Sequence, residues 1–452
     1  PELYNVMVEL KNAADPDRML NPGTIITDDP QLHLKDIKLN PTVQEEVDRC
    51  VECGYCEPVC PSRDLTLTPR QRIVVQRAIV QAHADGDEEL AAQLSADEQY
   101  PVIQTCAVDG MCQTNCPLHI NTGDLVRRLR ADGNSPAWQG VWDVAAKGWG
   151  PFVSAASLGM DAVHPIPTRA TNTVLGAARS IVGADRVPLL SKELPAGGRR
   201  RSSGHRRGPV GHPEVVYLPA CVNTMFGSAV PQEETLEFSV LSLLAAAGVG
   251  VTVPQGIEAV CCGTPWKSKG MTTGYATMRR RVVDIMQEAT HDGELTVISD
   301  AVSCSEGFVH ELEYEGVTGI RVVDAVQYIA DELLPVLPDL PKLRSAALHP
   351  TCSSTRMSWN DALHRCAQAI ADDVVVSDDW GCCGFAGDRG MLHPELTESA
   401  TAREAAQLHA REFDVYLSAN RTCEIGMQRA TGKPWRHVLS VLAERMVKFA
   451  PA

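Results

Sequence analysis

The alternation of apolar and polar positions divides the chain into a helical first part and a second part in which strands and helices alternate. Residues 4–14 carry apolar side chains at helical spacing, and the Asp-Pro and Asn-Pro-Gly sequences that follow predict an extended connector. From residue 41 to about residue 185 the pattern is mainly helical. Pro69 suits the first turn of one helix, and another helix is expected to begin at Asp124.

Beyond residue 214, short apolar runs alternate with longer helical patterns. The runs 215–218, 251–253 and 295–298 predict strands, and residues 234–247 and 273–289 predict helices. A similar order recurs from residue 346 onward. This alternation is typical of an α/β fold with parallel strands.

The second part also contains an internal repeat, because three sequence landmarks occur twice in the same order. They are a Pro-x-Cys sequence, a Cys-Cys-Gly sequence, and a Ser that precedes a Cys by five residues. The landmarks lie at Cys221 and Cys352, at residues 261–263 and 382–384, and at Ser299 with Cys304 and Ser418 with Cys423. Such a repetition predicts two duplicated modules.

Charge and composition exclude several classes of function. The chain has 452 residues, 41 Lys and Arg, 57 Asp and Glu, and a formal net charge of −16. An acidic chain repels a phosphate backbone, so we expect no nucleic acid as a partner. The sequence contains neither an apolar run of membrane-spanning length nor the pattern of an export leader, so we expect a cytoplasmic protein, soluble or peripheral on the inner face of the membrane.

A basic segment separates the two parts. Residues 193–213 are rich in Gly, Ser and Pro and contain the run Arg199, Arg200, Arg201, His205, Arg206 and Arg207. This composition favours a solvated, mobile tether. A weak, salt-sensitive contact with anionic lipid or with an acidic partner is the alternative interpretation.

The sixteen cysteines carry most of the predicted chemistry. A disulfide framework is typical of short secreted chains, which this is not. The first array is Cys50-x2-Cys53-x2-Cys56-x3-Cys60-Pro, and the second is Cys106-x2-Asp109-x2-Cys112-x3-Cys116-Pro. The first spacing is that of a [4Fe–4S] site. A zinc site would leave the second Cys-Pro array unexplained.

Two-cluster ferredoxins use crossed ligation, in which the last cysteine of each array binds the other cluster. One cluster would then take Cys50, Cys53, Cys56 and Cys116, and the other would take Cys60, Cys106, Cys112 and Asp109. The corner at Asp109 has two interpretations: a [4Fe–4S] cluster with a carboxylate ligand, or a [3Fe–4S] cluster with that corner empty. The long helical insert between the arrays predicts an all-helical ferredoxin domain.

Each module offers four further cysteines that follow predicted strands, where sites gather in α/β folds. The first set is Cys221, Cys261, Cys262 and Cys304, and the second is Cys352, Cys382, Cys383 and Cys423. Each set suits a polynuclear cluster or a single metal, and the alternatives are buried free thiols or a redox disulfide. The remaining Cys366 is predicted to pack in a core. His349 is expected to be structural rather than to tune the site, and His119 and His393 are left unassigned.

These motifs resemble a known group. A helical ferredoxin domain followed by two Cys-Cys-Gly modules is similar to the iron–sulfur subunits of glycolate oxidase, anaerobic glycerol-3-phosphate dehydrogenase and heterodisulfide reductase. The sequence Trp-Gly-Cys-Cys-Gly-Phe-Ala-Gly-Asp-Arg-Gly at 380–390 and the Asp109 motif look more specifically like fused FAD/iron–sulfur D-lactate dehydrogenases and their D-2-hydroxy acid relatives. The resemblance covers residues 40 to 450. One departure is that Gly307 and Gly426 replace the fifth cysteine of heterodisulfide-reductase modules, which argues against two full noncubane clusters.

The resemblance also implies a domain plan. Residues 1–40 look like the tail of a vanillyl-alcohol-oxidase-type flavoprotein domain with its connector, so that the chain, which starts at Pro1, would be the iron–sulfur half of a longer flavoenzyme. The helical ferredoxin domain would span 41–187, the linker 188–213, and the two Cys-Cys-Gly modules 214–340 and 341–452. The expected fold class is therefore mixed, with an all-helical two-cluster ferredoxin domain before two α/β repeat domains.

The function implied is electron transfer within an FAD-dependent D-2-hydroxy acid dehydrogenase, with D-lactate or D-2-hydroxyglutarate as substrate. Electrons would pass from FAD on the companion flavoprotein portion to a quinone, a cytochrome or an electron-transfer flavoprotein, and the substrate-oxidising residues would lie outside this chain. The alternatives are a heterodisulfide-reductase-like thiol/disulfide subunit and a structural, zinc-binding docking platform. Peripheral membrane contact and a homo-oligomer are left open.

Overall fold

The chain divides between residues 42 and 43 into two structural units. The computed structural model describes residues 2–24, 26–35, 37–201, 203–206, 213–230, 232–338 and 340–449. The first unit contains helix α1 (Glu2–Ala14) and the 3-10 turn η1 (Leu32–Leu34). Asp15 turns the chain after α1, because its carboxylate accepts a hydrogen bond from the backbone N–H of Met19.

The second unit begins with a helical region, as the sequence pattern predicts. Its elements are α2 (Pro69–Asp85), α3 (Glu88–Asp97), the π-helical turn η2 (Gln99–Gln104), α4 (Met111–Asn115), α5 (Thr122–Gly133), α6 (Pro136–Lys147), α7 (Trp149–Val163) and α8 (Thr168–Val182). Thr68 and Gln71 form a capping box at the start of α2, where Pro69 occupies the first turn. Gly86 ends the helix in the left-handed conformation, with φ 76°.

The first α/β module follows. Its strands are β1 (Gly204–Arg206), β2 (Val215–Leu218), β3 (Val251–Val253), β4 (Thr296–Ser299) and β5 (Val322–Asp324), and its helices are α9 (Val222–Met225), α10 (Leu236–Ala246), α11 (Thr264–Lys269), α12 (Thr272–Thr290), α13 (Val302–Tyr314) and α14 (Ala325–Tyr328), with the short turns η3 (Ile257–Ala259) and η4 (Ile329–Leu333). The strand order is β1-β3-β2-β4-β5. Strands β2 to β5 pair in parallel, and β1 pairs with β3 antiparallel.

The second module repeats this plan. Its strands are β6 (Leu343–Leu348), β7 (Ala371–Val375), β8 (Val415–Ser418) and β9 (Trp435–His437), and its helices are α15 (Cys352–Arg356), α16 (Asn360–Ile370), α17 (Arg389–Leu392), α18 (Pro394–His409), α19 (Arg421–Thr431) and α20 (Val438–Phe449). The order β7-β6-β8-β9 is the order β3-β2-β4-β5 of the first module, and all its pairs are parallel. The predicted mixed fold, helical first and α/β afterwards, is confirmed.

One detail supports duplication at the level of single atoms. The hydroxyl of Ser299 at the end of β4 donates to the carbonyl of Leu218 at 2.8 Å. The hydroxyl of Ser418 at the end of β8 donates in the same way to the carbonyl of His349 at 2.9 Å. These are the two serines that the sequence repeat pairs, and each bond ties two neighbouring strand ends beside a cysteine.

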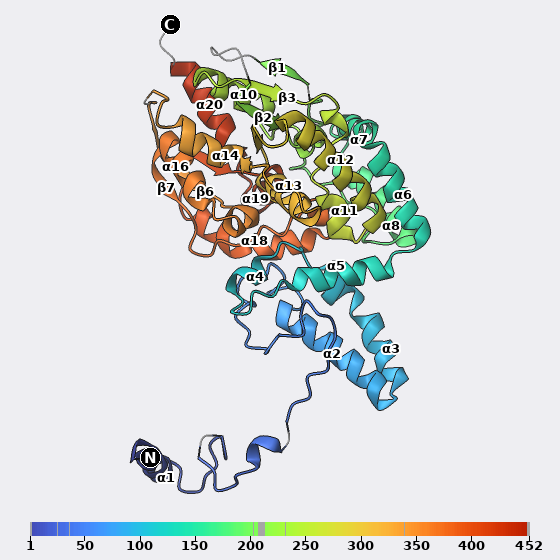
Figure 1. Ribbon diagram of the computed structural model, residues 1–452, viewed down its shortest axis with the longest axis vertical. Helices are drawn as coiled ribbons and strands as arrows, with labels where there is room; N and C mark the ends of the chain where they lie inside the picture. The colour runs from blue at the N-terminus through green and yellow to red at the C-terminus, as the bar shows by residue number, and fades with distance from the viewer. Residues whose placement is uncertain are drawn as a thin grey trace. The chain divides into compact units, whose positions relative to one another are not determined.

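The two sheets share one apolar core. It joins side chains of β2 and α10, such as Val216 and Leu243, to side chains of β6 and α20, such as Ala346 and Leu442, all of them buried. Helix α20 packs on α10 and on α16, and Figure 1 shows α10 and α20 side by side. A second buried cluster around Phe385 and Trp435 lies mainly in the second module and also includes Leu194 and Phe226.

The basic segment differs from the mobile tether expected from its composition. The guanidinium of Arg201 donates hydrogen bonds to the carbonyls of Pro219, Glu258 and Val260, and β1 adds an edge strand to the first sheet. These contacts hold Arg201 and residues 204–206 against the first module. Ser202 and residues 207–212, including Arg207, lie outside the described residues. In the part of the chain that is described, no helix is both long and apolar enough to cross a membrane.

Candidate metal centres

The two ferredoxin arrays adopt the same loop conformation. Glu52 and Gly54 have positive φ angles of 58° and 85°, and Val108 and Gly110, at the matching positions of the second array, have φ angles of 54° and 74°. Paired left-handed residues curl the backbone tightly around its own side chains. Since each pair flanks the second ligand position, Asp109 stands in the loop where the first array has a cysteine.

The second predicted ligand set surrounds one cavity. Cys60 comes from the first array, whereas Cys106, Cys112 and Asp109 come from the second, and all four line the same pocket together with Arg72. This grouping is the one that crossed ligation requires. Three thiols and a carboxylate around one enclosed space fit an iron–sulfur cluster, because soft thiolate donors suit iron and sulfide.

The first predicted set lies nearer the surface. Burial, together with the neighbouring thiols of Cys50 and Cys116, raises the pKa of Cys56 to about 11. Cys53 is exposed. The backbone N–H of Glu52 donates to the Cys50 sulfur at 3.4 Å. The chain therefore offers one buried thiol group and one that reaches solvent.

A buried cation lies beside the enclosed group. Arg72 is only 1% exposed, and its guanidinium is 3.7 Å from the Cys60 sulfur and 2.7 Å from the Ser62 hydroxyl. Burial lowers the pKa of Arg72, but the thiols of Cys106 and Cys60 outweigh burial and raise it overall. A buried guanidinium needs an opposite charge nearby, so this residue favours thiolates or an anionic cluster in the cavity.

Asp109 connects the enclosed group to the second module. Its Oδ2 is buried and makes no hydrogen bond within the described residues. Burial raises the pKa of Asp109, while the thiol of Cys382 and the charge of Arg356 oppose that rise. Arg356 donates to the Asp109 carbonyl at 3.4 Å and pairs with Glu306 of the first module at 2.6 Å. An orphaned carboxylate oxygen facing a thiol-lined cavity fits a metal ligand.

The four cysteines of the first module converge at the ends of its strands. The sulfurs of Cys221 and Cys261 are 3.5 Å apart. The thiols of Cys261 and Cys304 lower the pKa of Cys262 well below its usual value. The Thr264 hydroxyl lies 3.3 Å from the Cys262 sulfur. All four thiols are buried.

The second module brings its four cysteines together in the same way. The thiols of Cys352 and Cys383 raise the pKa of Cys382 well above its usual value. The thiols of Cys382 and Cys423 lower the pKa of Cys383. The backbone N–H of Gly384 also donates to the Cys382 sulfur at 3.5 Å. Both predicted sets of four thiols are therefore close together, as the repeat suggested; metal ligation by them stays a prediction.

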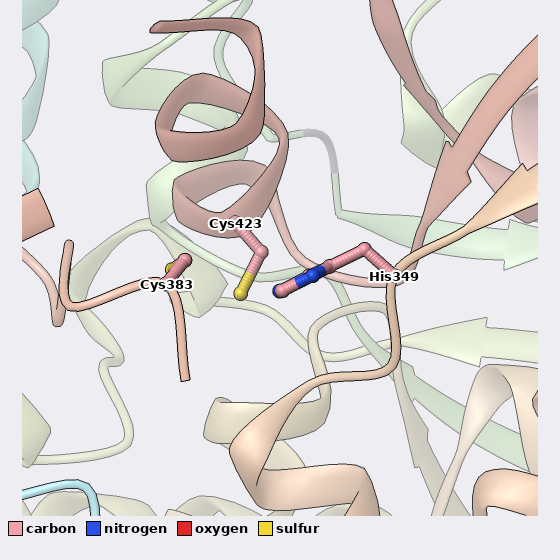
Figure 2. A group of neighbouring side chains, drawn as sticks. All are labelled: His349, Cys383 and Cys423. Atoms are coloured by element: carbon pink, nitrogen blue, oxygen red, sulfur yellow. The ribbon is translucent and has the colours of Figure 1, made fainter. Parts of the chain in front are cut away.

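A histidine that sequence reasoning did not place among the ligands joins the second set. One ring nitrogen of His349 and the sulfurs of Cys383 and Cys423 all lie within 4.8 Å of one another. Figure 2 shows the His349 ring and the Cys423 sulfur pointing toward each other. Burial alone would lower the pKa of His349, but Glu404 and the Cys383 thiol raise it to about 10. The sequence does carry one indication of this role: His349 stands directly before the Pro-x-Cys landmark, where the first module has Leu218.

The first module carries a different polar group near its thiols. Glu311 is fully buried, and neither of its carboxylate oxygens has a hydrogen-bond partner among residues that the structure describes. Burial raises the pKa of Glu311 well above its usual value, and the Cys262 thiol adds to the rise. A carboxyl in this environment is held in its neutral form.

The glycines at the fifth-cysteine positions face the paired cysteines. A Cβ added to Gly307 would lie 2.8 Å from the Cys262 carbonyl, and one added to Gly426 would lie 3.5 Å from the Cys383 sulfur. A side chain there would point at the thiol group, and the first module leaves no room for one. Crowding therefore accounts for the missing fifth thiol in the first module, whereas in the second module a Cβ at Gly426 would make only ordinary contacts.

The other singled-out residues lie apart from these groups. Cys366 is buried in α16 within the shared core, as predicted. His393 is hydrogen-bonded to Asp185 and Glu395. His119 is exposed. Sequence reasoning also did not identify Arg72, Arg356 or Glu404, since a single charged residue in a helical pattern carries no motif.

The chain matches two families of metal-binding domains. Residues 46–120 match the family described as a 4Fe-4S dicluster domain, and residues 215–308 and 346–428 match the family described as a cysteine-rich domain, the CCG domain. These matches coincide with the two cysteine arrays and with the two modules. The chain therefore combines one match to the 4Fe-4S dicluster family with two matches to the CCG family.

Comparison with characterised proteins gives distant, nearly full-length relatives. The chain is 22% identical over 421 residues to the glycolate oxidase iron-sulfur subunit of Escherichia coli (strain K12), which covers 88% of this chain and 94% of that protein. It is 20% identical to the probable glycolate oxidase iron-sulfur subunit of Bacillus subtilis (strain 168), over 85% and 88% of the two chains. An uncharacterised iron-sulfur protein of Methanococcus maripaludis is also 20% identical, over 92% of this chain and 72% of its own length. The predicted relation to glycolate oxidase iron–sulfur subunits is confirmed.

Proposed function

We propose that this chain is the iron–sulfur, electron-transfer part of an FAD-dependent D-2-hydroxy acid dehydrogenase. The observation that carries the proposal is the cavity that Cys60 of one array shares with Cys106, Cys112 and Asp109 of the other. A flavin takes two electrons from a hydroxy acid at once, whereas iron–sulfur clusters accept and release single electrons. Two such groups in one domain suit the passage of electrons from a flavoprotein partner to a separate acceptor.

The proposed ligands follow the predicted sets. Cys50, Cys53, Cys56 and Cys116 hold one [4Fe–4S] cluster, and Cys60, Cys106, Cys112 and Asp109 hold the second. The buried guanidinium of Arg72 stabilises negative charge at the second group, since it lies 3.7 Å from the Cys60 sulfur. Exposure of Cys53 makes the first group the one that an electron donor or acceptor on another surface approaches.

The substrate and partners are part of the same proposal. Two relatives bear the name of glycolate oxidase iron–sulfur subunits, and glycolate is itself a 2-hydroxy acid. The sequence at 380–390 and the aspartate in the second array favour D-lactate or D-2-hydroxyglutarate over glycolate, by their likeness to fused D-lactate dehydrogenases. FAD sits on the partner portion, and a quinone, a cytochrome or an electron-transfer flavoprotein takes the electrons.

The test uses the chain together with its flavoprotein portion, purified without oxygen. Addition of D-lactate or D-2-hydroxyglutarate should bleach first the flavin absorbance and then the cluster absorbance, whereas L-lactate and glycolate should bleach neither at a comparable rate. Cys112→Ser should abolish most of the cluster phase and leave the flavin phase. Cys366→Ser, which removes a core thiol outside every site, should leave both phases unchanged. Flavin bleaching that never reaches wild-type clusters would contradict the proposal.

A separate experiment addresses the corner at Asp109. If this carboxylate is a ligand, the oxidised wild-type protein gives no [3Fe–4S] electron paramagnetic resonance signal, and Asp109→Ala introduces one. Asp109→Cys should restore a fully thiolate-bound cluster with a changed reduction potential. A [3Fe–4S] signal already present in the oxidised, oxygen-free wild type would contradict ligation by Asp109.

A further inference from the structure

The two modules differ at one strand end beside their thiols. Strand β6 is followed by His349, whereas the matching β2 ends in Leu218. The serine hydroxyls that bond these two residues' carbonyls show that the positions correspond. The second module therefore presents a ring nitrogen at a point where the first presents only a hydrocarbon side chain.

Hydrogen bonding fixes which nitrogen of His349 faces the thiols. Its Nδ1 lies 2.9 Å and 3.1 Å from the two carboxylate oxygens of Glu404, so Nδ1 carries the proton that it donates. Its Nε2 is buried without a hydrogen bond in the described part of the chain. Both His349 and Glu404 are at most 2% exposed, so bulk water does not reach their polar atoms. Because the pKa of His349 is raised, Nε2 also carries a proton that faces the Cys383 thiol when no metal is bound, and a metal ion would take the place of that proton.

This arrangement is the one by which proteins prepare a histidine to bind a metal. A carboxylate that accepts from one ring nitrogen orients the ring and makes the other nitrogen a stronger donor. The two sulfurs of Cys383 and Cys423 lie within 4.8 Å of that ring nitrogen and of each other. Ligand atoms at about 2.0–2.3 Å from a shared ion lie closer together than this, so the three residues would need only a small contraction to bind one ion.

We propose that the second module holds a single Zn²⁺ ion through His349 Nε2, Cys383 and Cys423, with one sulfur of the Cys352 and Cys382 pair as the fourth ligand. Zinc prefers nitrogen and thiolate ligands in tetrahedral geometry. Binding releases the thiol protons and the His349 Nε2 proton into solvent and changes no oxidation state. The first module, with Leu218 and a buried neutral Glu311, lacks such a nitrogen and does not form this site.

The inference rests on the sequence prediction that the module cysteines bind a metal, and it is independent of the substrate and of the two ferredoxin groups. A failure of this inference is distinguishable from a failure of the proposed function. The iron content of the ferredoxin domain stays at about eight atoms per chain whether or not the second module binds zinc. Zinc and iron are both counted in the same sample, so a loss of one without the other identifies the site concerned.

The experiment is metal analysis and zinc X-ray absorption spectroscopy on the full chain, purified without oxygen. We expect one zinc per chain, with a nitrogen shell at about 2.0–2.1 Å and sulfur at about 2.3 Å. His349→Ala should remove the imidazole signal and the tightly held zinc. Glu404→Gln keeps a polar side chain of similar size but removes the charge, and it should weaken zinc binding about 10–100-fold in competition with a chelator.

Matched changes in the first module serve as controls. Cys304→Ser corresponds to Cys423→Ser, and Leu218→Ala corresponds to His349→Ala. The first-module variants should keep the zinc and its nitrogen shell, and Cys423→Ser should lose both. If His349→Ala does not fold, Glu404→Gln and Cys423→Ser still decide the question. Wild-type zinc bound by sulfur alone, zinc absent while iron exceeds eight, or equal loss in Cys304→Ser would overturn the proposal.

Discussion

The first and second Cys-Cys-Gly modules share one backbone plan but surround their thiols with different chemistry. Both have the same strand order, the same serine bond between strand ends, and four converging cysteines. Beside these thiols the first module places Leu218 and Glu311, whose carboxylate has no hydrogen-bond partner among the described residues, whereas the second places the His349–Glu404 pair. The shared backbone plan thus places the sulfurs alike, and the surrounding side chains distinguish the two sets.

The largest expected effect comes from giving the second module the residue of the first. His349→Leu leaves the Glu404 carboxylate buried without its partner, which should cost about 3–5 kcal/mol of local stability. The matched change Leu218→Met preserves volume and should cost less than about 1.5 kcal/mol. Native-state hydrogen exchange of β6 and α18 amides measures the first cost, and that of β2 amides the second.

A double variant makes this test specific. His349→Leu combined with Glu404→Leu removes both members of the pair, and it should recover part of the loss, because no buried charge remains. If the double variant is as unstable as the sum of the single changes, the two residues do not act as a pair.

A smaller difference is expected at the glycine of each Cys-Cys-Gly sequence. Gly263 and Gly384 have φ angles of 70° and 69°, so alanine at either position costs about 1–2 kcal/mol of backbone strain. A Cβ at Gly263 would also lie 2.3 Å from a Glu311 oxygen, whereas a Cβ at Gly384 would come no closer than 3.2 Å to any atom. Gly263→Ala should therefore lose about 1–3 kcal/mol more than Gly384→Ala in urea unfolding followed by tryptophan fluorescence. Equal losses would show that the first module relaxes around Glu311.

The smallest expected effect distinguishes the modules by the sign of a pH dependence. Asp324 and His437 end the matching strands β5 and β9, and each side chain accepts a hydrogen bond from a backbone N–H two residues later. Burial raises the pKa of Asp324 to about 7 and lowers the pKa of His437 to about 3.

The two shifts act in opposite directions on folding. The folded state holds the Asp324 proton more tightly than the unfolded state, so stability falls by about 1.4 kcal/mol as pH rises from 6 to 8. The unfolded state binds the His437 proton more tightly, so stability falls by about 2 kcal/mol as pH drops from 7 to 5. The two windows overlap between about pH 4 and 6.5, where the opposite slopes largely cancel. Asp324→Asn should therefore leave stability that rises with pH across this range, and His437→Asn should leave stability that falls with pH. A variant that tilts the curve in the opposite direction would contradict this assignment.

Much of the fold follows from local sequence patterns. Short apolar runs predict β2, β3 and β4, and the repeat of cysteine landmarks predicts the second module, because burial and strand-end loops leave direct marks in the sequence. Strand β1 was missed because a three-residue Gly-His-Arg strand at a sheet edge has neither apolar residues nor periodicity. Its pairing with β3 depends on the rest of the sheet.

The thiol groupings were also predictable, whereas the residues that distinguish them were not. Cysteine spacing is a local signal, and the crossed grouping of cysteines is expected from two adjacent arrays. The His349–Glu404 bond joins residues 55 positions apart, and the contact of Arg356 with the Asp109 carbonyl spans 247 positions. Such contacts depend on how distant elements pack against one another, which a single sequence does not reveal.

Low-temperature electron paramagnetic resonance of the oxygen-free chain, before and after reduction and with iron and sulfide counted, shows whether the two cysteine arrays hold clusters. We expect about eight iron atoms per chain and, on reduction, two [4Fe–4S] signals that interact magnetically because their ligand sets share two crossed loops. A protein prepared in this way that lacks iron and reduced-cluster signals would contradict the electron-transfer function.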